Sequence, residues 1–324
     1  MIMFSPEIAE DDITEYSALV ESGNADEALE SFLESYIVPM SQRFSTFLQN
    51  RVSLAGDLLT AAKEKKIKIE ISSAMTGFKD AYTNIYSQFV NDIYGDAVMT
   101  SLDVTSPQVR EFIKKDTIAK FIENTEQRLA ETDIKIRTTI REMQQELIRN
   151  ERDLTKFENM AGVLDSDVAA FKEELYARLQ ERVPDFYKMA EDGNFIEYSD
   201  GTMVGIDTYN EMATRTTVLN VERNSVMMQD AMDGNRIAVY YLRDDRPVKK
   251  EREICQEILA DEFYGESLIA YDEDAASLFD IWTVDEAMAE GAMGVNCRHS
   301  VRQLSEENQN RVDSLLFLAE SEAS

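Results

Sequence analysis

The chain has 324 residues, 44% of them hydrophobic, with 33 lysines and arginines against 63 aspartates and glutamates. Such a composition can bury a core, argues against disorder throughout, and at this length favours two domains over one. The net charge of −30 repels nucleic acid and anionic lipid, which argues against a general DNA-coating role. The same acidity would also suit a salty environment.

Targeting and redox features are few. No early stretch combines a basic start, an apolar core and a small-residue cleavage site, and no run of about 18 apolar residues could span a bilayer. We therefore expect a protein of a soluble compartment without a membrane anchor. Two cysteines, Cys255 and Cys297, cannot make the disulfide framework of small secreted domains, so we interpret both as thiols.

Residues 1–105 form the first predicted region, which is helical. After Asn24, a capping residue, residues 25–66 have apolar residues at helical spacing, are broken by Pro39 and are weakened at Gly56, which predicts two or three antiparallel helices. Residues 66–71 alternate polar and apolar side chains, which fits either a short strand or the irregular end of a helix. Three-and-four spacing then predicts a packed helix, and not a base-stacking surface, from aromatic and apolar residues: Phe78, Tyr82, Tyr86, Phe89, Ile93 and Tyr94.

Residues 106–189 form the second predicted region, a long-helix rod or bundle. Ser106 and Pro107 are a hydroxyl cap and a first-turn proline, and no glycine or proline follows until Gly162. Apolar residues at spacings of three, four and seven predict a packing seam, interrupted at Asp133 and Asn150. Charged residues off the seam predict a solvated, salt-bridged face, with self-association through the long helices as the alternative. A shorter helix over residues 166–179 ends before Pro184. The seam consists of Leu129, Ile136, Ile140, Met143, Leu147, Leu154 and Phe157.

The composition changes near residue 190, where glycines begin to cluster. Residues 195–204 predict a hairpin with a tight turn at Asp200-Gly201. A helix over residues 208–233, ended by Gly234, and a strand over residues 236–242 follow. We therefore predict an α+β domain over residues 190–305 and a C-terminal helix or tail over residues 306–324. The fold class of the whole chain is α+β, mainly α-helical.

The motifs of the 190–305 region come in a distinctive order. The Asp-Gly hairpin is followed by a helix with Tyr-x-x-Met-x-x-Arg-Thr, a Gly-Asn pair before an apolar strand, a Cys with a Gly ten residues on, and a closing Asn-Cys-Arg-His. These residues are Tyr209, Met212, Arg215, Thr216, Gly234, Cys255, Gly265, Asn296, Cys297, Arg298 and His299. The order resembles the Mu F-like head morphogenesis proteins, the minor capsid proteins of tailed phages. Relatives often have a histidine-containing segment after the strand and a tryptophan beside the first cysteine, which residues 241–245 and 253–257 lack.

The resemblance implies a virion protein, made in the host cytoplasm and present in few copies inside the head. It would bind the portal protein and capsid proteins during head assembly and take part in genome packaging or ejection, with DNA binding weak or indirect. It implies no catalytic residue, and we expect no enzyme. Two alternatives stay open: an effector enzyme ejected with the genome, and a cytoplasmic coiled-coil adaptor.

Cys255, Cys297 and His299 are the candidate site residues of that region. Thiolate and imidazole are ligands that zinc prefers, and Asp261 or Glu257 would supply a fourth. We favour the competing interpretation, with the cysteines packed as small apolar groups and His299 hydrogen-bonded. A thiol nucleophile with a histidine base is disfavoured, because no glycine-rich oxyanion segment flanks Cys255 and neighbouring glutamates oppose a thiolate.

Arg215 has two interpretations of its own. A structural ion pair with a carboxylate such as Asp207 or Glu211 is favoured over an anion or partner contact. The sequence contains no phosphate-binding loop, dinucleotide turn or His-Glu-x-x-His helix.

Overall fold

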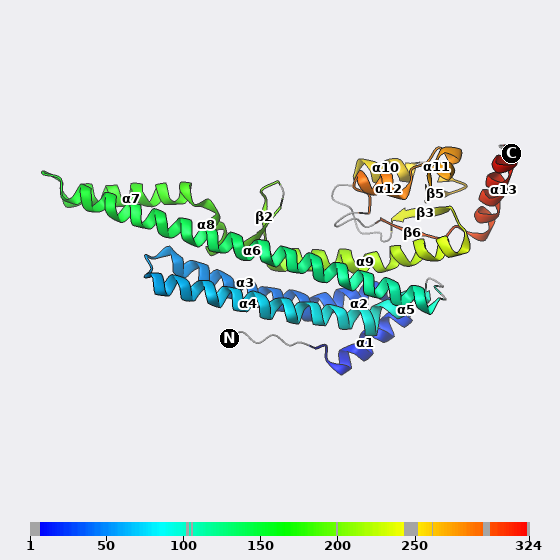
Figure 1. The fold of residues 1–324 in the computed structure, drawn as a ribbon, viewed down its shortest axis with the longest axis horizontal. Helices are drawn as coiled ribbons and strands as arrows, with labels where there is room; N and C mark the ends of the chain where they lie inside the picture. The colour runs from blue at the N-terminus through cyan, green and yellow to red at the C-terminus, as the bar shows by residue number, and fades with distance from the viewer. Residues whose placement is uncertain are drawn as a thin grey trace. The chain divides into compact units, whose positions relative to one another are not determined.

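The computed structural model describes residues 7–101, 104, 106–198, 200–242, 252–260, 262–293 and 299–322 (Figure 1). Most of these residues are helical, and a small sheet lies in the last third of the chain. The predicted fold class, α+β and mainly α-helical, is therefore confirmed.

The chain forms two compact units, each built from segments that are far apart in sequence. Unit 1 comprises Met1–Ala9, Glu30–Gln88 and Lys120–Glu211, and unit 2 comprises Glu10–Leu29, Phe89–Ala119 and Met212–Ser324. Several of these boundaries fall inside continuous helices. The division in sequence order at residues 105, 189 and 305 remains a prediction.

Unit 1 is a layer of long helices. Its elements are η1 (Leu33–Ile37), α3 (Val38–Ser53), η2 (Leu54–Gly56), α4 (Ala61–Gln88), α6 (Pro107–Glu158, from Lys120 on), α7 (Asp165–Arg182), α8 (Pro184–Ala190), the hairpin of β1 (Asn194–Glu197) with β2 (Met203–Gly205), and the start of α9 (Ile206–Asp233). The predicted start of the long helix is confirmed, since the backbone N–H of Val109 donates to the Ser106 hydroxyl at 3.4 Å. The hairpin is also confirmed: β1 and β2 pair antiparallel and Gly201 has φ +81°.

Aromatic rings fill the core of unit 1, as their spacing predicts. The Phe44 and Phe78 rings stack with centroids 4.2 Å apart, and Tyr86 and Phe121 stack at 3.6 Å. Tyr82 lies between them and its hydroxyl donates to the Asn210 carbonyl at 3.0 Å. All five rings are at most 2% exposed, so they are core and not a base-stacking surface.

Two predictions about the N-terminal helices need correction or completion. Pro39 does not break the helix: α2 (Ala25–Phe32), η1 and α3 continue one another, and Pro39 lies in the first turn of α3. A proline lacks an N–H and clashes with the carbonyl four residues back. The wider π-helical turn of η1, in which the Val38 N–H bonds to the Leu33 carbonyl, accommodates it. The alternating residues 66–71 lie inside α4 and are not a strand.

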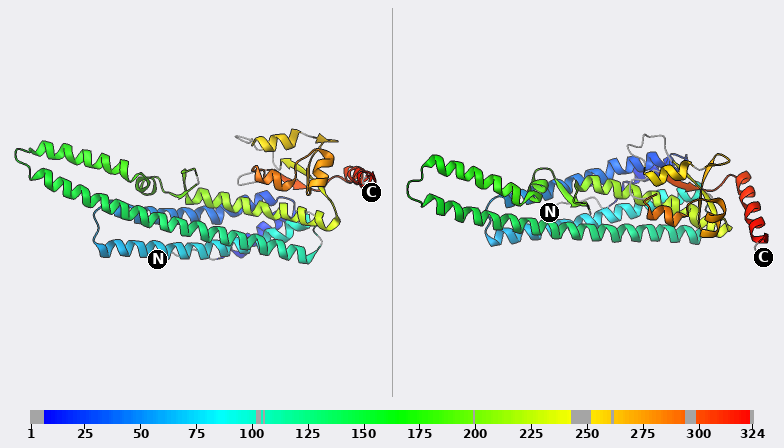
Figure 2. Two further views of the ribbon diagram at one scale, coloured as in Figure 1. Left: turned by 45° about the horizontal axis from the view of Figure 1, so that its top comes forward. Right: turned by 90° about the horizontal axis from the view of Figure 1, so that it is seen from above.

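Residues of the α6 seam pack against other helices of the same chain. Ile136 and Ile140 are fully buried in unit 1, and Phe157 stacks on Phe171 of α7 with centroids 4.4 Å apart. Figure 2 shows α7 antiparallel to the last part of α6 in both views, and the Asn150 amide donates to the Leu175 carbonyl at 3.1 Å. Ile136 and Ile140 are therefore not available to a partner, while self-association through other parts of the long helices remains a prediction.

Unit 2 is built on a four-stranded antiparallel sheet in the order β4-β5-β3-β6. The strands are β3 (Ile237–Leu242), β4 (Glu262–Phe263), β5 (Glu266–Ala270) and β6 (His299–Arg302). The helices are α1 (Glu10–Glu21), η3 (Phe89–Tyr94), α5 (Gly95–Ser101), the first turns of α6, α9 from Met212, α10 (Glu253–Ala260), α11 (Glu273–Phe279), α12 (Val284–Ala289) and α13 (Glu306–Glu322).

Both faces of the sheet are buried. Ala238 and Tyr240 of β3 pack in a cluster with residues of α9, α10 and α12. Ile237 and Val239 point to the other face and pack with residues of α11 and α13. Side chains alternate between the faces of a strand, so the apolar run of β3 serves two cores.

Candidate functional site

Two of the three candidate zinc ligands lie together in unit 2. Cys255 on α10 accepts a hydrogen bond from the Tyr240 hydroxyl at 3.2 Å, and His299 on β6 stacks on the Tyr240 ring with centroids 5.1 Å apart and planes at 9°. Cys255 is 1% exposed and His299 3%. Tyr240 thus joins the two residues in the core; sequence reasoning placed it in a strand but gave it no role.

The Cys255 thiol is enclosed, so a large substrate could not reach it. Its neighbours are apolar core residues, including Ile254 and Ile258, and a thiol buried to this degree behaves as a small apolar group. Among the described residues, no three His, Cys, Asp or Glu side chains are grouped to hold a metal ion. Asn296, Cys297, Arg298 and Asp261 lie outside the described residues, so the zinc site of Cys255, Cys297 and His299 remains a prediction.

Arg223 is the main residue that sequence reasoning missed. It lies on α9, is 4% exposed, and donates from Nη1 to the Met293 carbonyl at 2.6 Å and from Nη2 to the His299 carbonyl at 2.8 Å. Nη1 also lies 3.1 Å from the Asn220 amide oxygen. The planar guanidinium suits such a fork. Arg223 therefore fixes the residues on either side of 294–298 to α9.

Asp230 is a second buried node, also on α9. Its carboxylate is fully buried and accepts from the Tyr271 hydroxyl at 2.6 Å, the Asn235 amide at 2.9 Å and the Gln303 amide at 3.0 Å. All three donors are neutral, and their hydrogen bonds satisfy the buried carboxylate. Burial, together with the Asp230 carboxylate, raises the pKa of Tyr271 far above its usual range, so the phenol stays protonated as a donor.

The glycines of the motif order have conformational roles. Gly234 follows the last residue of α9 with φ +78°, and the Asn235 N–H returns to the Asp230 carbonyl at 2.8 Å. This geometry closes a helix in which glycine avoids a Cβ penalty. Tyr264 and Gly265 have φ +52° and +83° between β4 and β5, the two-residue hairpin turn that favours glycine. Sequence spacing found both glycines but could not assign these roles.

The remaining motif residues lie along α9. Tyr209 receives the Arg128 guanidinium over its ring at 5.5 Å and lies 6.5 Å from the Tyr198 ring. Met212, Arg215 and Thr216 follow on the same helix and are half-buried. The predicted ion pair of Arg215 with Asp207 or Glu211 remains a prediction.

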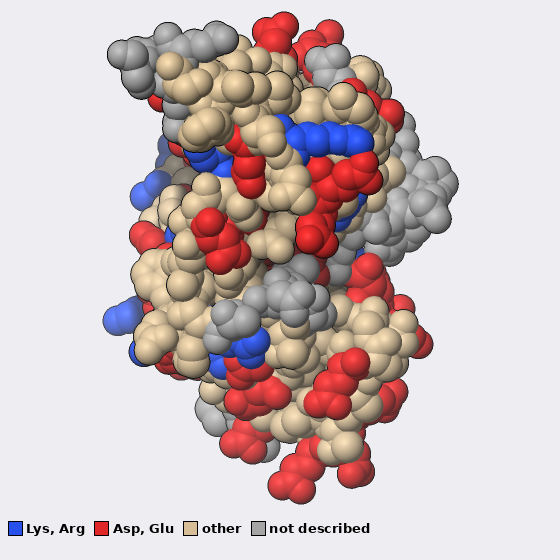
Figure 3. All heavy atoms as spheres, turned by 90° about the vertical axis from the view of Figure 1, so that its right-hand side faces the viewer, with Lys and Arg blue, Asp and Glu red and all other residues tan. Residues whose placement is uncertain are grey.

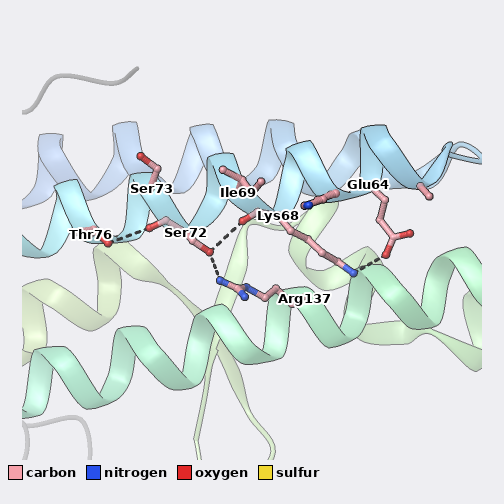
Figure 4. A pocket seen from close by; sticks show the side chains of 9 residues that line it. Glu64, Lys68, Ile69, Ser72, Ser73, Thr76 and Arg137 are labelled. Atoms are coloured by element: carbon pink, nitrogen blue, oxygen red, sulfur yellow. Dashed lines mark hydrogen bonds and ion pairs between the residues drawn. The ribbon is translucent and has the colours of Figure 1, made fainter.

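A groove lies between α4 and α6 in unit 1 (Figure 4). It has a volume of about 660 Å³ and is lined by polar side chains from both helices. Lys68 pairs with Glu64, and Arg137 pairs with Asp133 at 2.7 Å and donates to the Ser72 hydroxyl. An anion would have to displace the protein's own carboxylates from two of the cations, so the groove attracts anions only modestly. The lining residues are Ala61, Glu64, Lys65, Lys68, Ile69, Ser72, Ser73, Thr76 and Arg137.

No protein-family description matches the chain, and neither the curated proteins nor the solved structures contain a significant match. Among the described residues, no helix is long and apolar enough to cross a membrane.

Proposed function

We propose that the protein is a minor capsid protein of a tailed phage, which binds the portal protein and the inner capsid during head assembly. The observation that carries the proposal is that four of the motif residues have structural roles in unit 2. Gly234 ends a helix, Gly265 turns a hairpin, and Cys255 and His299 pack on Tyr240. The motif order therefore serves the shape of an α+β unit, which supports a structural role.

The burial of the thiol supports a role without catalysis. A nucleophile must reach its substrate, whereas Cys255 is enclosed by the core between β3, α10 and α12. The effector alternative would need Cys255 and His299 for activity. Under the proposed function, a Cys255→Ala chain still enters particles, and those particles infect at the normal efficiency. Normal particles that fail to infect would favour the effector.

The charge of the surface supports the proposed location inside a head. Figure 3 shows acidic side chains spread over one face, with fewer basic ones between them, in keeping with the net charge of −30. Such a surface repels packaged DNA and attracts partners with basic patches. The protein would share the head with the genome without being coated by it.

The test is co-expression with the portal and major capsid proteins of the same phage, followed by mass spectrometry of purified particles. We expect the chain in heads at a low copy number. Particles assembled without portal protein are the matched control, and we expect them to contain less of the chain because the portal contact is lost. Absence from complete particles, with free protein left in the lysate, would overturn the proposed function.

A further inference from the structure

The C-terminal helix α13 is firmly docked along its first half. The Asn308 amide donates to the buried Glu266 carboxylate at 2.7 Å, and the Arg311 guanidinium lies over the Tyr264 ring at 4.1 Å. Val312 is fully buried and packs in the core on the face of the sheet that α11 and α13 cover. This half of the helix is thus held in one orientation by unit 2.

The same orientation turns apolar residues outward in the second half of α13. Residues advance by about 100° around a helix, so Phe317 and Leu318 lie on the side opposite Val312. Their side chains are 70% and 55% exposed, and the neighbouring Leu315 is 42% exposed. Leu316, which lies near the direction of Val312, packs partly on the core. The α13 outer face is defined here as Leu315, Phe317 and Leu318.

This face differs from an ordinary solvent face. A surface helix normally places polar residues opposite its buried stripe, and a single exposed apolar residue needs no explanation. Here three large apolar residues occur within four positions, on a chain in which 30% of residues are charged. Clustered exposed apolar surface with a polar surround is typical of an interaction site.

Charge decides which occupant the face suits. The polar surround includes the exposed Asp313, one turn before Phe317 on α13, and the whole chain carries −30. A second copy would bring like charges together around the apolar contact, which costs binding free energy. An apolar groove with lysine and arginine on its rim would instead complement both the face and its surround.

We propose that the α13 outer face docks as a helix into an apolar groove with a basic rim on another protein of the phage head. This inference rests on the proposed function and deepens it by naming the attachment surface. Phe317 supplies the main anchor and Leu318 the second, while the acidic surround speeds association and sets the orientation.

The test measures binding of the full chain to purified portal protein and to purified major capsid protein. We expect the α13 outer face to be needed for binding to one of the two, and the double variant Phe317→Glu with Leu318→Glu to weaken that binding about thirtyfold or more. The conservative Phe317→Leu retains most of the affinity. Binding should weaken as salt rises, because the charges of the rim and surround are screened. Both substituted residues are exposed, so the variants should fold, which circular dichroism checks.

The matched control introduces two glutamates at similarly exposed apolar residues of unit 1. Met160 and Leu164 are 61% and 65% exposed, and Met160→Glu with Leu164→Glu should leave binding within about twofold. Equal binding by the two double variants, or no binding to either head protein, would overturn the docking face. Loss of self-association in the Phe317 and Leu318 variant, with head-protein binding intact, would assign the face to a second copy and also overturn it. Mass spectrometry of particles judges the proposed function separately, because a chain attached by another surface would still be present in heads.

Discussion

Each of the two units is stabilised internally by a different kind of interaction. The core of unit 1 is a set of stacked aromatic rings between long helices, with Phe44, Phe78 and Phe121 at its centre. Unit 2 buries apolar residues on both faces of a sheet. Two buried charged residues of α9, Arg223 and Asp230, also hold this helix in place against the other elements of unit 2. Apolar contacts specify position loosely and contribute most of the stability, whereas buried polar groups specify one arrangement and are costly when broken.

The largest effect is expected in the aromatic core of unit 1. Phe78→Ala removes a fully buried ring between Phe44 and Tyr82 and should lower the free energy of unfolding by about 4 kcal/mol. Urea denaturation measures this loss. Phe112→Ala, at a ring that is 58% exposed, is the matched control and should cost less than about 0.5 kcal/mol. Similar losses for the two variants would contradict the ring-stacked core.

Arg223 gives the corresponding test in unit 2. Arg223→Met keeps much of the side-chain volume but withdraws the donors from the Met293 and His299 carbonyls, and should cost about 3 kcal/mol. Hydrogen exchange should rise mainly in β6 and α12, the elements next to those carbonyls. Arg149→Met, at a side chain that is 60% exposed, is the control. A loss no larger than that of the control would show that the fork does not hold this region.

This difference between the units also explains what the sequence could predict. The aromatic spacing from Phe78 to Tyr94, the start at Pro107 and the Asp200-Gly201 hairpin depend on local chemistry and were correctly predicted. Pro39 was wrongly predicted to break a helix, because a single π-helical turn absorbs the proline and leaves no pattern in the sequence.

The buried polar nodes could not be predicted in the same way. Arg223 and Asp230 lie seven positions apart on α9 and look like ordinary charged residues of a solvated helix. Their distant partners follow 41 to 76 residues later, and spacing within one helix says nothing about such contacts. These partners are Met293, His299, Tyr271 and Gln303. The sequence indicated only one partner of these nodes. Gly234-Asn235 was found as a motif, and Asn235 is one of the donors to Asp230.

The Asp230 node should show an intermediate effect. Asp230→Ala leaves the Tyr271 hydroxyl and two amides without their acceptor and should cost about 2 kcal/mol. Tyr271→Phe removes one of the three bonds and should cost about 1 kcal/mol. Asp274→Ala, at a carboxylate that is 97% exposed, serves as the control in urea denaturation. Equal losses for Tyr271→Phe and Asp230→Ala would mean that the amides contribute nothing.

Replacing one glycine in each unit by alanine should change the stability of the protein in opposite directions. Gly265→Ala places a Cβ at φ +83° in the β4-β5 turn of unit 2 and should destabilise by about 1 kcal/mol. Gly77→Ala lies within α4 of unit 1, where an added Cβ meets nothing within 4 Å, and should stabilise by about 0.5–1 kcal/mol. Thermal denaturation of both variants measures the signs. Two changes of the same sign would contradict one of the assigned backbone roles.

The smallest effect concerns the ion pair at the start of α11. The Arg236 guanidinium, helped by the Ala275 N–H, lowers the pKa of Asp272 from 3.8 to about 2. Because the folded pKa is the lower one, the stabilisation is present above about pH 4 and is lost as the pH falls toward 2. The Asp272 side chain is 38% exposed, so solvent screening keeps the contribution below about 1 kcal/mol.

Asp272→Asn isolates that contribution, since asparagine also caps a helix but cannot pair with Arg236. The difference in free energy of unfolding between the two chains should be largest near pH 6 and shrink below pH 4, and added salt should reduce it at pH 6. A carboxyl NMR titration of Asp272 should give a midpoint near 2. A midpoint near 3.8 would mean that Arg236 leaves the carboxylate to solvent, and α11 would then be held by its apolar contacts in the same manner as the helices of unit 1.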